Sequence, residues 1–568
     1  MSLLEIKNLH LNFGDKNSSE KALKGVSMRL DAGKSLGLVG ESGSGKTITS
    51  LSIMRLLDET ECFYPAGEIL YNGVDLLSLP EEEIRKYRGG KIGMIFQEPM
   101  TSLNPVYTCG DQVSEILELH KNLSKAQAKE RVLELFEEVQ LPEPPIVFKK
   151  YPHQLSGGQK QRVMIAMAIA CKPELLIADE PTTALDVTVQ KTILNLLTNL
   201  CEKRGMAMIF ISHDLGVINA VADDVAVMKH GELVEIGKVA DIFNNPQHPY
   251  TRGLIACRPN PDLSLKRLPT VSDFLEAGKI LSLEEVIEPL KIGVKPENPQ
   301  RKSGSEPLLK VKNLVVSLPI KTNIWGRATR TIEAVNDVSF DVFEGEIVGL
   351  VGESGCGKTT LSRTLLNLMK PTSGEIFWKG QRIDNLGKAE WKKLRRDVQI
   401  IFQDPFSSLN PAQSVGKSII EPMIVHGIGK NNEERKALTK ELLAKVKLDP
   451  EMFDRLPHQF SGGQRQRIGI ARALAVQPKF IICDESVSAL DVSVQATVLN
   501  LLLDLKDEFN LTYIFISHDL SVVKFIADHL LVMRKGKIVE QGKSSEVYEK
   551  PSETYTQSLI EAIPKLEV

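Results

Sequence analysis

The chain has 568 residues, of which 42% are hydrophobic and 25% charged, a composition typical of a globular protein with sizeable cores. The formal net charge of −3 provides no basic field for nucleic acid, so nucleic acid is not expected as a partner. No run of about 18 apolar residues predicts a membrane-spanning helix, and the first residues have neither the basic nor the long apolar stretch of a signal peptide.

Two strands are predicted at the start of the chain. Residues 4–9 alternate between apolar and polar side chains, and residues 23–30 form a second strand-like stretch. A third apolar run, residues 36–39, leads directly into Gly-Glu-Ser-Gly-Ser-Gly-Lys-Thr at residues 40–47. This is the phosphate-binding pattern of Gly, four residues, Gly, Lys and Ser or Thr.

The residue types in this loop are those that phosphate binding requires. Glycines let successive backbone N–H groups surround the phosphates, and the helix that follows directs its positive end toward them. Lys46 is expected to neutralise the β- and γ-phosphates, and the Thr47 hydroxyl to bind Mg²⁺. The positions predicted to contact nucleotide are Gly40, Ser42, Gly43, Gly45, Lys46 and Thr47.

The same loop occurs again in the second half of the chain. Gly-Glu-Ser-Gly-Cys-Gly-Lys-Thr at residues 352–359 follows the apolar run 347–351, and residues 309–314 repeat the character of residues 4–9. Two copies with matching flanks make chance occurrence a poor explanation. The predicted nucleotide contacts here are Gly352, Ser354, Gly355, Gly357, Lys358 and Thr359.

Later landmarks also keep their spacing in the two halves. Ser156 and Ser461 each precede a glutamate, Glu180 or Glu485, by 24 residues. A period this long indicates a duplicated domain rather than a solenoid, whose repeats are about 20–50 residues long. Residues 259–308 are rich in proline and mixed in charge, and they predict a linker with one short helix around residues 281–290. The predicted domains are therefore residues 1–258 and 309–568, joined by the linker 259–308.

Helical periodicity dominates the middle of each half. Val132, Leu135, Phe136 and Val139 share one helix face in the first half, and residues 438–446 show a similar apolar stripe in the second. Such stripes usually belong to a core rather than to a functional site. Each half is therefore predicted to be an α/β domain that contains the phosphate loop (P-loop), with a parallel-sheet core that carries a helical subdomain.

A predicted apolar strand ends in two acidic residues in each half, at residues 175–180 and 480–485. Parallel sheets place ligand groups at the carboxyl ends of their strands, where Asp179 and Asp484 could hold Mg²⁺. Glu180 and Glu485 are the candidate general bases, which must reach the attacking water by a hydrogen bond. A single acid pair is a weak signal and often a helix cap, but a pair downstream of each phosphate loop is a strong one.

The pentapeptides Leu-Ser-Gly-Gly-Gln at residues 155–159 and Phe-Ser-Gly-Gly-Gln at residues 460–464 complete the pattern. A serine, two glycines and a following helix make a further anion site from backbone N–H groups. In register with the phosphate loops and the acid pairs, these pentapeptides resemble the signature of ABC ATPases. The resemblance covers nearly all of the chain except the linker.

This resemblance implies that the two halves pair head to tail, with each ATP between the phosphate loop of one half and the signature of the other. One site would combine Lys46, Thr47, Gln97, Asp179, Glu180 and His213 with Ser461 and Gly463. The second site would combine Lys358, Thr359, Gln403, Asp484, Glu485 and His518 with Ser156 and Gly158. Both sites keep the glutamate, the histidine and a full signature, so two competent sites are expected.

The resemblance also assigns roles to a glutamine and a histidine in each half. Gln97 and Gln403 correspond to the residue that contacts Mg²⁺ and faces the membrane subunit. His213 and His518 correspond to the histidine near the γ-phosphate. A single histidine after a strand is usually structural, but two histidines that each follow a candidate base by 33 residues favour a functional role.

Shorter motifs indicate a branch of the family. Ser-Leu-Asn-Pro follows each glutamine, at residues 102–105 and 408–411, and His-Pro-Tyr-Thr lies at residues 248–251. These motifs resemble the dipeptide, oligopeptide and nickel importer ATPases. The second half has Glu-Thr-Tyr-Thr at residues 553–556, so the tyrosine recurs but the histidine does not. His248 and Tyr250 are expected to pack a terminal helix rather than to take part in catalysis.

Two departures from the family pattern bear on the second site. Relatives stack adenine on an aromatic ring near the first strand, and Phe13 suits that role in the first half. The aligned position of the second half is Leu318, and Trp325 is a weak substitute for it. Glu485 is followed by Ser486, where the first half has the usual proline, Pro181. Little effect on the second base is expected from that change.

The resemblance implies a fused ATPase subunit, with ATP and Mg²⁺ as cofactors, that energises import of peptides or related small solutes. Its partners would be two transmembrane permease subunits and an extracytoplasmic solute-binding protein. The resemblance also implies that the protein is peripheral and lies at the cytoplasmic face of the inner membrane. A soluble tandem ABC ATPase that acts on ribosomes is the alternative. Such proteins usually carry a charged helical linker, whereas this linker is rich in proline. The sequence does not identify the solute.

Overall fold

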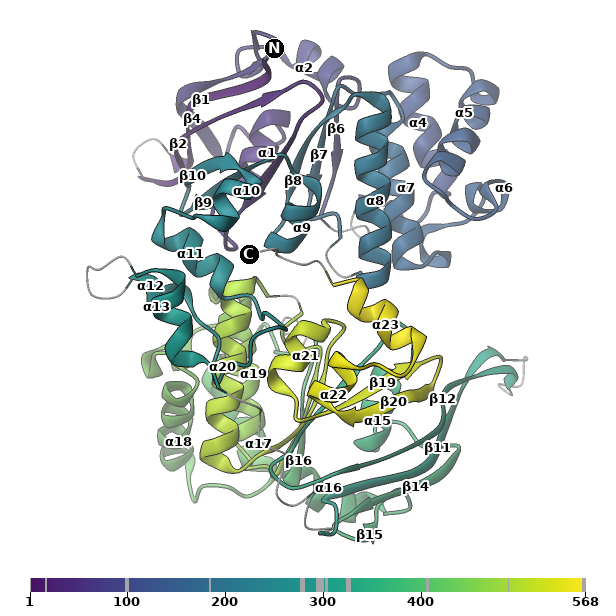
Figure 1. The fold of residues 1–568 in the computed structure, drawn as a ribbon, viewed down its shortest axis with the longest axis vertical. Helices are drawn as coiled ribbons and strands as arrows, with labels where there is room; N and C mark the ends of the chain where they lie inside the picture. The colour runs from purple at the N-terminus through teal and green to yellow at the C-terminus, as the bar shows by residue number, and fades with distance from the viewer. Residues whose placement is uncertain are drawn as a thin grey trace. The chain divides into compact units, whose positions relative to one another are not determined.

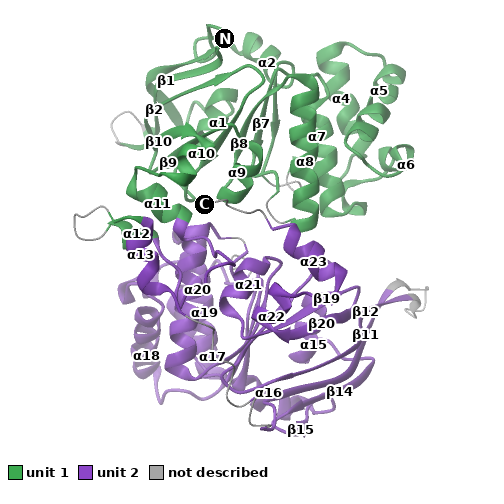
Figure 2. Cartoon of the chain, in the orientation of Figure 1, with its two compact units in different colours: residues 1–255, 271–282, 564–568 green, residues 256–270, 283–563 purple. Residues whose placement is uncertain are grey.

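The computed structural model describes residues 2–15, 18–97, 102–182, 185–275, 281–292, 301, 305–322, 328–404, 408–488 and 490–563. These residues form two compact units, shown in different colours in Figure 2. Unit 1 contains the described residues of 1–255 and 271–282, and unit 2 contains residues 256–270 together with the described residues of 283–563.

Unit 1 has two sheets. The antiparallel sheet has the order β2 (Ser18–Asp31), β1 (Ser2–Asp15), β4 (Cys62–Tyr71), β5 (Val74–Asp75). The larger sheet has the order β10 (Glu232–Lys238), β9 (Asp224–Lys229), β3 (Ser35–Val39), β8 (Ala207–Ile211), β7 (Leu175–Asp179), β6 (Ile92–Ile95). Only its edge pair β10 and β9 is antiparallel.

The α-helices of unit 1 are α1 (Lys46–Met54), α2 (Glu81–Tyr87), α4 (Cys109–Lys121), α5 (Lys125–Glu138), α6 (Pro144–Phe148), α7 (Gly157–Ile169), α8 (Val187–Arg204), α9 (Leu215–Val221), α10 (Val239–Asn244), α11 (Pro249–Ala256) and α12 (Val271–Leu275). A short 3₁₀ turn, Pro152–Gln154, precedes α7. Helices α4, α5 and α6 lie on the opposite flank of the unit from β1, β2 and β4 (Figure 1).

Unit 2 repeats this arrangement. Its antiparallel sheet has the order β12 (Ala328–Val342), β11 (Leu309–Thr322), β14 (Ser373–Trp378), β15 (Gln381–Arg382). Its larger sheet has the order β16 (Val398–Ile401), β17 (Phe480–Asp484), β18 (Thr512–Ile516), β13 (Ile347–Val351), β19 (His529–Arg534), β20 (Lys537–Lys543). Here β19 and β20 form the antiparallel edge.

The α-helices of unit 2 are α13 (Leu283–Ile287), α15 (Lys358–Leu365), α16 (Lys388–Asp397), α17 (Val415–Val425), α18 (Asn432–Lys445), α19 (Gly462–Leu474), α20 (Val492–Phe509), α21 (Leu520–Ile526), α22 (Ser544–Glu549) and α23 (Thr554–Glu561). The 3₁₀ turns are Glu288–Leu290, Pro450–Asp454 and Pro457–Gln459. Among the described residues, no helix combines the length and the apolar character needed to cross a membrane.

Two buried apolar layers hold unit 1 together. Residues from β1, β2 and β4 pack against one face of the larger sheet, where Leu36 and Leu38 are fully buried. The other face packs against the helices, and this layer includes Val132, Leu135 and Phe136, all with no exposed surface. These burials confirm the predicted core stripe and the predicted α/β class with a helical subdomain. The antiparallel sheet of each unit was not predicted.

The segment predicted as a linker, residues 259–308, is divided between the two units. Residues 256–270 belong to unit 2, where the buried side chain of Asn500 on α20 accepts a hydrogen bond from the Leu268 N–H and donates one to the Leu268 carbonyl, both at 2.8 Å. Residues 271–282 belong to unit 1, and the Arg252 guanidinium donates to the Leu281 carbonyl at 3.0 Å. The predicted short helix is α13, continued by the 3₁₀ turn Glu288–Leu290.

His529, at the start of β19, is expected to make unit 2 sensitive to acid. Burial, with the nearby positive charge of Arg301, lowers the pKa of His529 from 6.5 to about 4. The unfolded chain therefore binds more protons than the folded chain between these values, so stability is lost as pH falls from 6.5 to 4. The loss should reach about 2 kcal/mol by pH 5.

Urea unfolding of the full chain at pH 7 and pH 5 measures this effect. His529→Gln should remove that part of the pH dependence, whereas His458→Gln, at an exposed position of the same unit, should leave it in place. Equal pH dependence in the wild type and His529→Gln would contradict the prediction.

Candidate active site

The first phosphate loop connects the end of β3 to the start of α1. Gly40 has a φ of +151° and Gly45 a φ of +103°, values that residues other than glycine rarely adopt. A Cβ atom on Gly40 would lie 2.2 Å from the Met228 carbonyl oxygen, so this turn has no room for a side chain. A Cβ atom on Gly43 would meet nothing within 4 Å. The loop therefore packs tightly against β9 on one side and is open at Gly43, where Ser42 is also exposed.

Lys46 begins α1 and is buried, with 6% of its surface exposed. Its ammonium donates to the carbonyl oxygens of Gly40 at 2.7 Å and Glu41 at 2.9 Å. Both acceptors are neutral carbonyl oxygens, and the side chain keeps its positive charge next to the loop. The loop thus holds a buried cation beside an open glycine-rich turn, which suits an anionic phosphate group.

The second phosphate loop has the same construction. Gly352 has a φ of +152°, and its Cβ would lie 2.2 Å from the Met533 carbonyl oxygen. Lys358 is 4% exposed and donates to the carbonyl oxygens of Gly352 at 2.6 Å and Glu353 at 3.0 Å. Gly355 is open, as Gly43 is. The remaining predicted contacts of this loop are Ser354, which is exposed, Gly357, which caps α15, and Thr359, on the first turn of α15.

Asp179 and Asp484 end the buried strands β7 and β17, beside the phosphate loops. The Thr47 hydroxyl donates to Asp179 Oδ1 at 3.4 Å, and the Ser362 hydroxyl donates to Asp484 Oδ2 at 3.2 Å. Burial raises the pKa of Asp179 to about 6 and also raises the pKa of Asp484. Among the residues that the structure describes, none makes a hydrogen bond with the buried Asp484 Oδ1. An unsatisfied carboxylate oxygen near hydroxyl groups fits a bound Mg²⁺, which prefers oxygen ligands.

Glu180 follows Asp179 in a strained backbone conformation. Its φ is +46°, a left-handed value that is uncommon for glutamate and is often found at functional sites. Gln97 Nε2 donates to Glu180 Oε2 at 3.1 Å, and His213 Nδ1 lies 3.2 Å from Glu180 Oε1. The structure therefore brings together three residues that are far apart in the sequence but were predicted to share one site.

Glu485 repeats this cluster in unit 2. Its φ is +47°, Gln403 Nε2 donates to its Oε2 at 2.8 Å, and His518 Nδ1 lies 3.7 Å from the same oxygen. Burial alone would raise the pKa of Glu485, but the polar contact with His518 and the positive charge of Lys358 outweigh burial and lower that pKa. This glutamate is thus ionised at neutral pH, as a general base must be.

The two signature serines cap helices of the helical subdomains. The Ser156 hydroxyl accepts from the Gln159 N–H at 3.3 Å at the start of α7, and the Ser461 hydroxyl accepts from the Gln464 N–H at 3.3 Å at the start of α19. Gly158 and Gly463 lie in the first turns of these helices. A Cβ atom on Gly463 would come within 2.2 Å of the Val494 side chain, so glycine is required there for packing.

The candidate adenine-stacking residues occupy corresponding positions. Phe13 lies near the end of β1, and its half-buried ring packs against the core of unit 1. Leu318 lies on β11 and packs against the core of unit 2. Trp325 lies outside the described residues. The aromatic ring is thus present at this position of unit 1 and absent from the same position of unit 2.

Each phosphate loop also has a contact that the sequence did not suggest. The buried Tyr250 hydroxyl accepts a hydrogen bond from the Glu41 N–H at 3.0 Å, and the Tyr555 hydroxyl accepts one from the Glu353 N–H at 3.1 Å. Tyr250 is buried on its helix as predicted, and both tyrosines also contact the phosphate loops. The signal that could have revealed this is that the tyrosine, and not the histidine, recurs 305 positions later.

Comparison with known proteins identifies the family. The sequence family described as ABC transporter matches residues 23–183 and 335–488, which contain both phosphate loops and both signatures. The family described as oligopeptide/dipeptide transporter, C-terminal region, matches residues 234–276 and 539–568. These matches cover the two halves in turn, in agreement with a duplicated domain.

Curated relatives match over the whole chain. The glutathione import ATP-binding protein GsiA of Escherichia coli O157:H7 is 47% identical over 571 residues, which cover 100% of this chain and 90% of the relative. The protein of the same name from Pectobacterium atrosepticum is 45% identical and covers 99% of this chain and 89% of the relative. The chain therefore belongs to the ABC transporter family and is a tandem ATP-binding protein of the oligopeptide/dipeptide transporter type.

Proposed function

We propose that this protein hydrolyses ATP to energise the import of peptides or related small solutes through a separate membrane permease. The observation that carries the proposal is the cluster at the carboxyl ends of the parallel strands, which recurs in both units. Each cluster has a phosphate loop with a buried lysine, a buried aspartate, and a strained glutamate contacted by glutamine and histidine. The tail matches to the transporter family favour transport over the alternative of a ribosome-bound ATPase.

The residues of unit 1 can divide the chemistry among them. Lys46 supplies positive charge to the phosphates, and Asp179 with Thr47 and Gln97 would hold Mg²⁺. When bound, Mg²⁺ neutralises negative charge on the phosphates. Glu180 accepts a proton from the attacking water, while Gln97 and His213 orient its carboxylate. Lys358, Thr359, Gln403, Asp484, Glu485 and His518 take the same roles in unit 2.

We further propose that residues 1–258 and 309–568 act as the two ATPase halves, connected by residues 259–308. Each phosphate loop would pair with the signature of the other half, so that Ser461 and Gly463 complete the site at Lys46 and Ser156 and Gly158 complete the site at Lys358. Family membership with two matched domains in one chain supports this intramolecular pairing. Closure of the halves on ATP and reopening after hydrolysis would drive the permease.

A cavity of about 310 Å³ in unit 1 suits the docking of a permease segment. Its lining includes Met54, Met94, Met164, Met167 and Phe96, and methionine side chains adapt readily to a partner surface. Phe96 is 42% exposed and directly precedes Gln97. A segment bound here would therefore touch the chain next to a residue that contacts Glu180. Unit 2 carries Arg472 at the position of Met167, so two different permease subunits would fit the two units.

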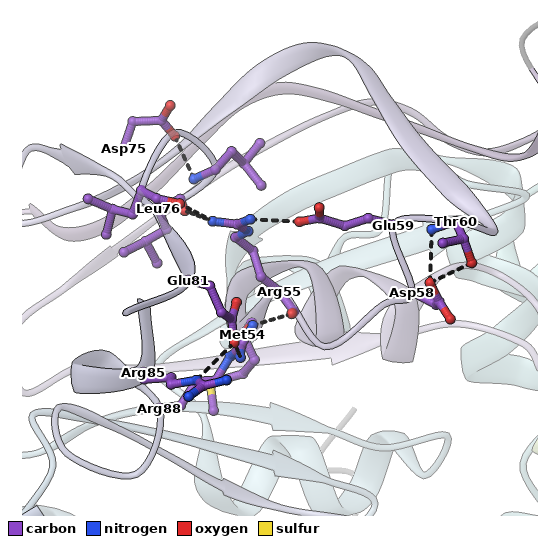
Figure 3. A network of polar contacts seen from close by, with 12 residues as sticks. Met54, Arg55, Asp58, Glu59, Thr60, Asp75, Leu76, Glu81, Arg85 and Arg88 are labelled. Carbon is purple, nitrogen blue, oxygen red and sulfur yellow. Dashed lines mark hydrogen bonds and ion pairs between the residues drawn. The ribbon is translucent and has the colours of Figure 1, made fainter. Parts of the chain in front are cut away.

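A polar network fixes the wall of this cavity to the phosphate-loop helix. Arg88 donates to the carbonyl oxygens of Met54, at 2.7 Å, and Arg55 at the end of α1, and it pairs with Glu81 at 2.7 Å (Figure 3). Arg55 reaches Glu59 at 2.6 Å from the same end of the helix. Movement of the cavity wall would thus be transmitted to α1, whose other end begins at Lys46.

We propose peptides of the size of glutathione as the solute, because the curated relatives are glutathione import proteins. An extracytoplasmic solute-binding protein would deliver the solute to two permease subunits. The chain itself would be peripheral, at the cytoplasmic face of the inner membrane.

Affinity capture of the tagged chain from detergent-solubilised membranes tests the proposal. Two polytopic membrane proteins in comparable amounts are expected, and ATP hydrolysis by the reconstituted complex should rise with a loaded solute-binding protein. Phe96→Asp should lose the membrane proteins, and Ile146→Asp, at an exposed apolar residue of α6, should retain them. Capture of ribosomal proteins in place of membrane proteins would overturn the transport function.

Replacement of Phe13 should weaken nucleotide binding in unit 1 alone. Phe13→Leu gives unit 1 the residue of unit 2 and removes a ring that can stack on adenine, so the Kd for ATP should rise about threefold to tenfold. Leu318→Phe should strengthen binding in unit 2 by a similar factor. Isothermal titration calorimetry of each variant with ATP measures the two changes in Kd. Unchanged affinity in both variants would show that neither position contacts the base.

A further inference from the structure

The tail of each unit is anchored to the edge of the larger sheet before it reaches the phosphate loop. Glu235 on β10 accepts hydrogen bonds from the Gln247 N–H at 2.7 Å and the His248 N–H at 3.1 Å. Glu540 on β20 accepts from the Ser552 N–H at 2.7 Å and the Glu553 N–H at 3.3 Å. A glutamate at the corresponding position thus fixes the start of α11 in unit 1 and the start of α23 in unit 2.

The tyrosine that follows each anchor is held on two sides. The Tyr250 ring is fully buried, the Lys229 ammonium lies 4.9 Å from its centroid, and the hydroxyl accepts from the Glu41 N–H at 3.0 Å. In unit 2 the Arg534 guanidinium lies 4.6 Å from the Tyr555 centroid. Both cations end the strand that packs against the loop, so ring and loop are fixed to one element.

The backbone of Glu41 joins the tyrosine to the lysine of the phosphate loop through the two peptide groups that flank this residue. Its N–H donates to Tyr250, and the carbonyl of the same residue accepts from Lys46 at 2.9 Å. Glu353 makes the same two bonds, with Tyr555 and with Lys358 at 3.0 Å. On its other side each loop is held by a turn after the strand: the Gly231 N–H donates to the Ser44 carbonyl at 3.0 Å, and the Gly536 N–H to the Cys356 carbonyl at 2.9 Å.

We propose that Tyr250 and Tyr555 are positioning residues that hold the first turn of each phosphate loop in its nucleotide-binding form, and so link the C-terminal tail of each half to its affinity for ATP. The inference rests on the proposed function in that the loops bind ATP. The lysine must exchange the loop carbonyls for a phosphate oxygen, and the tyrosine holds the backbone of Glu41 or Glu353 in place during that exchange. Loss of the hydroxyl removes an acceptor from a part-buried N–H, which loosens the turn.

Tyrosine-to-phenylalanine variants separate this role from packing, because they keep the ring and remove only the hydroxyl. Amide hydrogen exchange of the full chain without nucleotide should become about tenfold faster in residues 40–46 of Tyr250→Phe and stay unchanged in residues 352–358. Tyr555→Phe should show the reverse pattern. The Kd for ATP with Mg²⁺ should rise about fivefold to tenfold in the affected unit, with a smaller change in kcat.

Matched controls are two other buried tyrosines whose hydroxyls also make a hydrogen bond within the described part of the chain. Tyr71 donates to Glu174 at 3.2 Å and Tyr513 to the Leu502 carbonyl at 3.2 Å, both outside the phosphate loops. Tyr71→Phe and Tyr513→Phe should leave exchange in both loops unchanged. Equal exchange and equal Kd in Tyr250→Phe and the wild type would overturn the proposal, as would faster exchange that Tyr71→Phe reproduces. Faster exchange in a protein that binds no ATP would support the loop contact and overturn the proposed function.

Discussion

Replacement of both Glu180 and Glu485 by glutamine is expected to lower ATP hydrolysis about 10³-fold while ATP still binds. Glutamine keeps the size of the side chain and can still contact Gln97 or Gln403, but it cannot accept the proton of the attacking water. The left-handed backbone at both positions should tolerate the change, because the substitution adds no branch at Cβ. Steady-state phosphate release and equilibrium ATP binding measure the two parts of this prediction.

The single variants give the control. Each single variant should lose hydrolysis in its own unit only. Comparison of the remaining ATP hydrolysis rates of Glu180→Gln and Glu485→Gln therefore shows whether the two units are equally active. Asp214→Asn, which changes a charge at the cap of α9, should retain hydrolysis. Full hydrolysis by the double variant would remove these glutamates from the role of general base.

Replacement of Lys46 by alanine is expected to abolish ATP binding in unit 1, with a Kd at least about 100-fold higher. The lysine is the buried cation of the loop, and a charged hydrogen bond to phosphate contributes about 1.5–3 kcal/mol, to which the loss of charge neutralisation adds. Calorimetry should then report one ATP bound per chain instead of two. Lys358→Ala should give the same stoichiometry through loss of the site in unit 2.

Lys34→Ala serves as the control for charge alone. Lys34 lies just before β3, is 53% exposed and pairs with Asp223 on the surface, so its removal should leave the stoichiometry at two. If Lys46→Ala still binds two ATP molecules with unchanged affinity, the loop at residues 40–47 is not the phosphate site.

The phosphate loops could be predicted from the sequence because their chemistry is local. Glycines, lysine and threonine lie within eight residues, and their spacing alone predicts which of them form the turn and which would contact phosphate. The grouping of Gln97, Glu180 and His213 depends on strand order, yet the family resemblance predicted it and the hydrogen bonds agree. The strained φ of Glu180 left no trace in the sequence, because nothing near a glutamate marks a left-handed backbone.

Long-range pairings were the part that sequence patterns did not reveal. Strand β4 pairs with β1 although its segment contains Pro65 and Gly67, residues that usually indicate a turn. The Tyr250 hydroxyl meets the Glu41 N–H across 209 positions of the chain, and its burial was predicted while its partner was not. In both cases the side-chain pattern indicates which residues are buried but does not specify which distant backbone group they meet.

The alternation of the segment between the two halves has a practical consequence for dividing this protein. A polypeptide that starts at residue 309 would lack Leu268, and the buried Asn500 amide would lose both of its backbone partners. A polypeptide that ends at residue 270 would instead lack Leu281, which accepts from Arg252. Since residues 256–270 belong to unit 2 and residues 271–282 to unit 1, no single cut yields both units whole. A cut before residue 256 separates residues 271–282 from the rest of unit 1, and a cut after residue 282 separates residues 256–270 from the rest of unit 2. Each unit therefore stays whole only while the two halves are covalently joined.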